Sequence, residues 1–244
     1  HPHPGTVPGA NLENPMTPTL QPPTPSPVAT LAADTTSATS ATTPIQHTWR
    51  EHEQPFTAVV AQVRDWDAAS PCEGWSARDV LAHVIDTQRE FLAKHGQALP
   101  DPSASEGGTG TGTPAAASTP SAHDPAQQWR THAAAVDRLL ADESVAEQQF
   151  DGFFGPTTIG ETMARFYGFD LLVHRWDIGT SQGDEVGFSD EELTAIDTAV
   201  DGFGEHAYAP GIFGAAVEVG EDAARQVRVL GRTGRTVRTG DRAS

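Results

Sequence analysis

The chain has 244 residues and a formal net charge of −18, with 15 lysines and arginines against 33 aspartates and glutamates. This balance argues against a general nucleic-acid or anionic-membrane binder, because binding to phosphate groups requires clustered cations. The single cysteine, Cys72, excludes an intrachain disulfide and is compatible with a reducing compartment, so we expect a cytoplasmic protein. No apolar run approaches the ~20 residues that span a bilayer, and no signal peptide is recognisable, so no membrane association is expected.

Two stretches of low complexity divide the chain. Residues 1–46 are rich in Pro, Thr, Ser and Ala and cannot bury enough apolar surface to offset the entropy lost on ordering, which predicts a disordered N-terminal tail. A second stretch, at about 97–123, predicts a flexible loop. The amphipathic segments on both sides of this loop need partners, so we place it within one helical domain, 47–231. Residues 232–244 are expected to be a polar C-terminal tail.

The first two helices are predicted before the long loop. Residues 47–66 carry Trp49, Phe56 and other apolar side chains at helical spacing. The next helix opens at Ser76, with Asp79 three residues later in the pattern of a capping box, and runs to a stop at Gly96.

Three further helix starts follow the loop. Asp124 is an N-cap candidate, and Pro125 follows it at the first helical position. Another helix is expected from Thr158 and a fifth from Ser189, each with a glutamate three residues later. After Tyr208 the segments GIFGAAVEV and RQVRVLGRTGRTV are short, β-branched and interrupted by glycine, which predicts loops and a small strand pair.

Four principal helices with one long connection predict an all-α fold, a four-helix bundle with a short C-terminal loop or β extension. No repeat pattern, Gly-rich phosphate loop or nucleophile elbow is found.

The most apolar stretch, FYGFDLLVHRWD over 166–177, carries two titratable residues on one helix face. Asp170 and His174 are four residues apart, which places their Cβ atoms ~5–6 Å from each other. The surrounding positions are apolar almost all round, as in a helix buried within a bundle. A buried carboxylate must be compensated by a metal ion, an arginine or a hydrogen bond from a histidine.

A third ligand candidate is His83, in the apolar segment DVLAHVID of the second helix. Together with Asp170 and His174 it would make a site of three protein ligands, suited to zinc or to iron(II), with a position open for water or substrate. A metal-free His–Asp hydrogen bond remains the alternative. Candidate acceptors for the ring N–H groups are Asp79, Asp86 and Asp177. The remaining histidines, at 1, 3, 47, 52, 95, 123, 132 and 206, are assigned to tails, loops or polar helix faces.

Two segments, SPCEGWSARDVLAHVIDTQ over 70–88 and FDLLVHRWDIGTSQG over 169–183, resemble a known family. They are similar to the DinB-like superfamily of metal-binding four-helix bundles, and within it to the actinobacterial branch around the mycothiol-dependent maleylpyruvate isomerase N-terminal domain. The late segments APGIFGAAVEV and GRTGR resemble the end of this branch, so the resemblance covers roughly 47–235. The matching residues are Pro71, Cys72, Gly74, Trp75, Asp79 and His83, then Asp170, His174, Trp176 and Asp177.

By position, the resemblance assigns the metal ligands to His83, Asp170 and His174. It implies zinc, with nickel or iron as alternatives, and mycothiol, a low-molecular-weight thiol, as a cosubstrate. The isomerase itself is expected to carry glutamate where this chain has Asp170, so the metal or its affinity is expected to differ.

The expected function is a metal-dependent thiol transferase or isomerase, in which a metal-activated thiolate attacks a small electrophile. Its partners would be the thiol and the electrophile, and a homodimer is left open. Tyr167 is a candidate hydrogen-bond donor to substrate, with a packed core aromatic as the alternative, and Cys72 is expected to pack at the entry of its helix. The alternative functions are a metal-dependent hydrolase, a non-catalytic metal-binding or small-molecule-binding protein, and a purely structural bundle.

Overall fold

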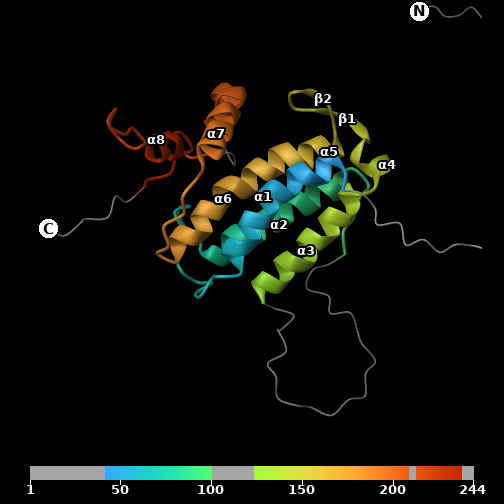
Figure 1. Cartoon of the computed structure of the whole chain (residues 1–244), viewed down its shortest axis with the longest axis horizontal. Helices are drawn as coiled ribbons and strands as arrows, with labels where there is room; N and C mark the ends of the chain where they lie inside the picture. Colours follow the sequence, from blue (N-terminus) through green and yellow to red (C-terminus); the bar gives the residue numbers. More distant parts are fainter. Residues whose placement is uncertain (1–41, 101–123, 209–212, 238–244) are drawn as a thin grey trace, which may run out of the picture. The chain divides into compact units, whose positions relative to one another are not determined.

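The computed structural model describes residues 42–100, 124–208 and 213–237, drawn in colour in Figure 1. The expected N-terminal tail, apart from residues 42–46, and most of the expected loop lie outside the described residues. The described part is mainly helical, which confirms the all-α prediction. None of the described helices is both long and apolar enough to cross a membrane. The long helices are α1 (Pro44–Val60), α2 (Ala77–Lys94), α3 (Pro125–Leu140), α6 (Gly168–Ser181) and α7 (Asp190–Phe203).

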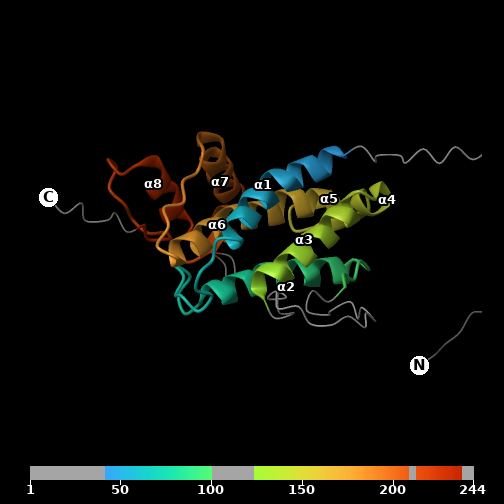
Figure 2. The same cartoon turned by 60° about the horizontal axis from the view of Figure 1, so that its bottom comes forward.

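Helices α1, α2, α3 and α6 form the predicted four-helix bundle. Each of them contacts two of the others: α1 packs against α3 and α6, and α2 packs against the same two helices. Figures 1 and 2 show α1 and α6 side by side along much of their length. Their interior side chains, which include Trp49, Phe56, Trp129, Leu171 and Ile178, are fully buried.

Capping residues set most of the helix starts at the predicted positions. Ser76 and Asp79 form a complete capping box on α2, and Asp124 caps α3. Helix α1 begins earlier than predicted, because Thr43 and Gln46 form a further capping box within residues assigned to the tail. A cap satisfies backbone N–H groups that have no partner within the helix, and so fixes the first turn.

The last bundle helix is irregular just before its polar pair. A short helix, α5 (Ile159–Glu161), leads into a π-helical segment, Thr162–Tyr167, which continues directly into α6. π-Helical turns within α-helices are often found at functional sites. Here the segment ends three residues before Asp170, next to the polar pair of α6.

Glycines let α6 approach its neighbours closely. A Cβ atom at Gly168 would lie 2.7 Å from Cδ2 of His52 on α1, and one at Gly179 would lie 2.2 Å from Cγ2 of Val186. Larger residues at these positions would push α6 away from α1 and from the chain that follows it.

Helix α6 is apolar on most of its surface and contributes to two cores. Leu171 and Ile178 belong to the bundle interior, whereas Leu172 and Val173 pack in a second core with residues of α7 and α8 (Arg225–Arg232). Its polar residues therefore lie in an almost completely buried element, as the sequence predicted.

The expected C-terminal strand pair is absent from the described residues 213–237, where Arg225–Arg232 is helical instead. Helix α8 packs against α7 and buries Val229 and Leu230, so tertiary packing overrides the β-propensity of its valines. The two strands that do form, β1 (Gln149–Gly152) and β2 (Gly155–Thr158), make an antiparallel hairpin between α4 (Glu143–Ala146) and α5.

Candidate metal centre

A cavity of about 630 Å³ lies where α2, α6 and the C-terminal segment, residues 213–237, meet. The three predicted metal ligands all line it, and so do Cys72 and Trp75 from the turn before α2. Residues 233–235 form part of its wall on the C-terminal side. The cavity is large enough for a small-molecule ligand.

His83, Asp170 and His174 converge in this cavity. Each offers one nitrogen or oxygen atom, and these atoms lie within 4.8 Å of one another. The two imidazole rings are 5.5 Å apart between centroids, and Nε2 of His174 is 3.3 Å from Oδ1 of Asp170. The structure thus brings together, from two helices, the three residues that the sequence singled out.

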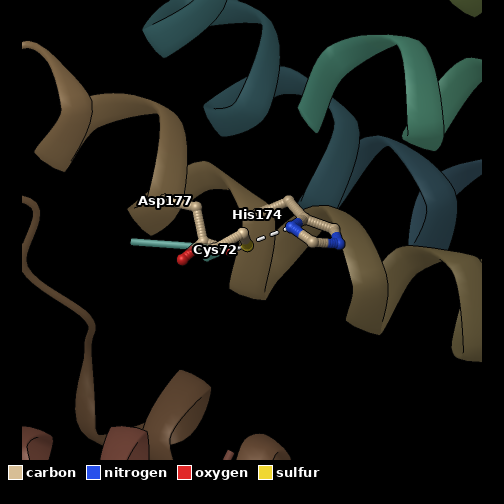
Figure 3. Close-up of side chains that lie close together, drawn as sticks. All are labelled: Cys72, His174 and Asp177. Atoms are coloured by element: carbon tan, nitrogen blue, oxygen red, sulfur yellow. Dashed lines mark hydrogen bonds and ion pairs between the residues drawn. The ribbon is translucent and has the colours of Figure 1, made fainter. Parts of the chain in front are cut away.

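Asp177 fixes the orientation of the His174 ring. Its Oδ2 lies 2.9 Å from Nδ1 of His174, as the close grouping of these side chains in Figure 3 illustrates. Because a carboxylate only accepts hydrogen bonds, Nδ1 carries a proton and Nε2 is the nitrogen that faces Asp170. Of the three candidate acceptors, Asp177 has this role, whereas Asp79 caps α2 and Asp86 is exposed.

Arg235 holds Asp177 from the opposite side. Its Nε donates to Oδ1 at 2.9 Å and its Nη2 donates to Oδ2 at 2.6 Å, while Nη1 donates to the carbonyl of Thr233 at 3.0 Å. Both partners of the ion pair are buried. Sequence reasoning placed Arg235 in a polar tail and missed this contact, although the GRTGR segment that contains it was part of the family resemblance. The segment is held in place because the buried carboxylate requires a counter-charge.

A second group of donor atoms shares His174: Cys72, His174 and Asp177. The Cys72 thiol donates to Oδ2 of Asp177 at 3.4 Å, and its sulfur is 4.0 Å from Nη2 of Arg235. A cation at this point would lie beside the guanidinium group, on a carboxylate that already accepts bonds from Arg235 and His174. The first group is therefore the better metal site.

The charge states of His83 and Asp170 suit a metal ion, whereas His174 must lose a proton to bind one. Burial lowers the pKa of His83, against the opposing effect of Asp170, and so favours the neutral imidazole that can ligate a cation. Burial would raise the pKa of Asp170, but the charge of His174 and its hydrogen bond outweigh this effect and lower that pKa. For His174 burial is likewise outweighed, because Asp170 and the hydrogen bonds to it and to Asp177 raise the pKa of the ring. One carboxylate and two imidazoles are fitting ligands for zinc, which would displace the proton from Nε2.

Tyr167 lines the cavity, but its hydroxyl is already engaged. It donates to the carbonyl of Thr87 at 3.2 Å, and the ring packs 5.3 Å from that of Phe91 between centroids. Burial, aided by the nearby acids Asp170 and Glu90, raises the pKa of the phenol. These contacts fit the packed core aromatic, and donation to a substrate stays a prediction.

One histidine assigned to a polar face is in fact buried. His132, on α3, is 1% exposed, and its Nε2 lies 2.9 Å from Oε1 of Gln88 on α2. The error arose because the neighbouring alanines gave no strong apolar signal in the sequence. No carboxylate contacts this ring among the described residues.

Comparison with known proteins gives one family match. The family model described as the mycothiol maleylpyruvate isomerase N-terminal domain matches residues 49–179, a span that contains all three candidate ligands. Comparisons with curated proteins and with solved structures give no match.

Proposed function

Since the chain belongs to the mycothiol maleylpyruvate isomerase N-terminal domain family, within the DinB-like superfamily, we propose that it is a metal-dependent thiol transferase or isomerase. His83, Asp170 and His174 would hold a divalent ion, with zinc as the expected metal and nickel or iron as alternatives. Mycothiol, the thiol in the family's description, would be the cosubstrate.

The observation that supports this proposal best is the convergence of three ligand atoms within 4.8 Å of one another on the wall of a cavity. Three protein ligands leave a position open towards the cavity. An ion bound there would lower the pKa of a thiol and make its thiolate available at neutral pH.

The residues around the ligands would keep this site ready to bind. Arg235 keeps Asp177 ionised, since burial would otherwise raise the pKa of that carboxyl, and Asp177 retains the proton on Nδ1 of His174. The ring of Trp75 packs against that of His83, with 4.9 Å between the centroids. A ligand set held in this way loses little conformational entropy when the ion binds.

The reaction would begin with attack of the thiolate sulfur on an electrophilic carbon. If the addition is permanent the product is a thioether, and if it reverses after rotation about a former double bond the product is an isomer. The proposal places this chemistry in the cytoplasm, where thiols are kept reduced.

Metal analysis of the full-length purified protein tests the ligand assignment. We expect one divalent ion per chain in the wild type, and loss of that ion in His83→Ala. His47→Ala is the matched control, because His47 is an exposed histidine on α1, remote from the cavity residues. Equal metal content in His83→Ala and His47→Ala would show that the ion is bound elsewhere.

An assay of mycothiol consumption with a reactive electrophile then tests catalysis. We expect the wild type to accelerate the reaction and His83→Ala to run at the uncatalysed rate. A metal-loaded wild type that gives no acceleration with any electrophile would leave a metal-binding protein without thiol-transfer activity.

A further inference from the structure

Four phenylalanines form one wall of the cavity that holds the candidate ligands: Phe166, Phe169, Phe203 and Phe213. Phe203, at the end of α7, lies in the middle, with ring centroids 5.9 Å from Phe166, 6.0 Å from Phe169 and 6.1 Å from Phe213. The rings come from the π-helical segment, α6, α7 and the C-terminal segment. The rings stand edge-on or tilted to one another, so an apolar aromatic wall lies beside the proposed metal centre.

This wall is open to solvent on one side. Phe166 is 44% exposed, and the ring of Phe154, in the turn of the β1–β2 hairpin, lies 5.7 Å from that of Phe203. Phe154 is itself 64% exposed. Contiguous exposed aromatic surface is unusual on a folded domain and marks an interaction site, and here it continues into a cavity of the size of a small molecule.

Among the residues that the structure describes, the cavity lining offers no unpaired lysine or arginine to an anionic substrate. Among its lining residues, Arg235 alone carries a guanidinium or ammonium group, and the charge of this group is paired with the buried carboxylate of Asp177. The acids Asp170 and Glu73 also line the cavity. The negative charges of Asp170 and of one thiolate would together balance those of a divalent ion. Within this described lining, a dicarboxylate such as maleylpyruvate would find no unpaired lysine or arginine.

We propose that the electrophile is a neutral molecule whose flat apolar group lies against these four phenylalanines. The inference rests on the proposed function for the thiol chemistry, and adds the class of the second substrate. With an activated alkene, the sulfur forms a bond to one alkene carbon, and the π electrons move to the other carbon, which takes a proton from water. Thiol and alkene together make up the thioether, so no oxidant or reductant is needed.

A series of maleates tests the charge and the apolar group separately. Maleate, diethyl maleate and dibenzyl maleate share one electrophilic double bond, and each is offered with mycothiol to the metal-loaded full-length protein. Each rate is corrected for the uncatalysed reaction. We expect the kcat/KM for dibenzyl maleate to exceed that for diethyl maleate by about 10-fold, which is the effect expected from burial of one aromatic group. We expect maleate to be the poorest substrate. A preference for maleate would overturn the inference.

Equilibrium binding of dibenzyl succinate, which has no double bond and does not react, separates this inference from the proposed function. Calorimetry measures the dissociation constant. We expect Phe166→Ser to bind dibenzyl succinate about 5-fold more weakly than the wild type, because about half of the contact with one aromatic group is lost. The metal content of this variant should be unchanged. Phe153→Ser is the matched control, because Phe153 is also exposed but contacts Phe154 and His206 instead of the cavity phenylalanines.

The outcomes distinguish the two claims. If no maleate reacts but dibenzyl succinate binds in a Phe166-dependent way, the thiol chemistry fails and the assignment of a neutral apolar ligand stands. If dibenzyl succinate does not bind, or binds equally to both serine variants, the assignment is wrong, whatever the catalytic result.

Discussion

Two buried histidines of the bundle show opposite behaviour. His174 on α6 is 7% exposed and His132 on α3 is 1% exposed, so both rings are removed from water. Burial alone lowers the pKa of an imidazole, and it lowers the pKa of His132 to about 3. The pKa of His174 is raised instead, because two carboxylates bind its ring.

The difference is visible in the sequence. His174 has Asp170 four positions before it and Asp177 three positions after it, which places both acids on its own helix face. At the corresponding positions His132 has Gln128 and Ala135. A buried histidine therefore becomes a candidate ligand through its acidic helical neighbours rather than through burial itself.

The largest effect is expected from removing the charge that organises the His174 cluster. Asp177→Asn leaves the buried guanidinium of Arg235 without a counter-charge, so we expect it to lower the free energy of unfolding by about 3–5 kcal/mol. Urea unfolding measures this loss. Asp137→Asn is the control, since Asp137 pairs with Arg50 near the surface, and such pairs contribute about 1 kcal/mol or less. Similar losses in the two variants would mean that the buried pair does not hold the C-terminal segment.

The next effect concerns the pH dependence of stability that His132 imposes. Its pKa is about 3 in the folded chain and 6.5 in the unfolded chain, so between these values the unfolded state binds more protons. The contribution of His132 to stability must therefore fall as pH falls, by about 2 kcal/mol between pH 7 and pH 5. His132→Gln cannot titrate, and in urea unfolding at the two pH values it should lack this part of the loss. An unchanged pH dependence in the variant would show that the ring is already protonated when buried.

The sequence predicted the bundle helices and the pair of Asp170 and His174 because these depend on local rules, whereas the placement of His83 beside them rested on the family resemblance. Capping residues, apolar periodicity and the spacing of Asp170 and His174 all act within one helix. The ion pair of Asp177 with Arg235 joins positions 58 residues apart, and nothing near Arg235 in the sequence marks it as buried. Its position depends on how the C-terminal segment folds back over α6, which local patterns do not encode.

The C-terminal strand prediction was wrong for a related reason. The valines and glycines around residues 225–237 favour extended structure locally, yet the segment forms α8, whose Val229 and Leu230 enter the core shared with α7. Arg232 then pairs with Asp197 and Asp201 of α7, which a strand would place differently. Both errors concern the elements added to the bundle, where packing decides the local structure.

The smallest effect is expected at Tyr167, which extends the comparison from imidazoles to a phenol. Its hydroxyl lies near Asp170 but bonds to the backbone carbonyl of Thr87, and burial raises its pKa, so it stays neutral at physiological pH. Tyr167→Phe should therefore lower the free energy of unfolding by only about 0.5–1.5 kcal/mol, the usual contribution of one hydrogen bond. Metal content and mycothiol consumption should not change if the ring only packs. A large fall in the rate of mycothiol consumption at unchanged metal content would instead assign the hydroxyl to the substrate, and would show that a buried group without a charged partner can still belong to the site.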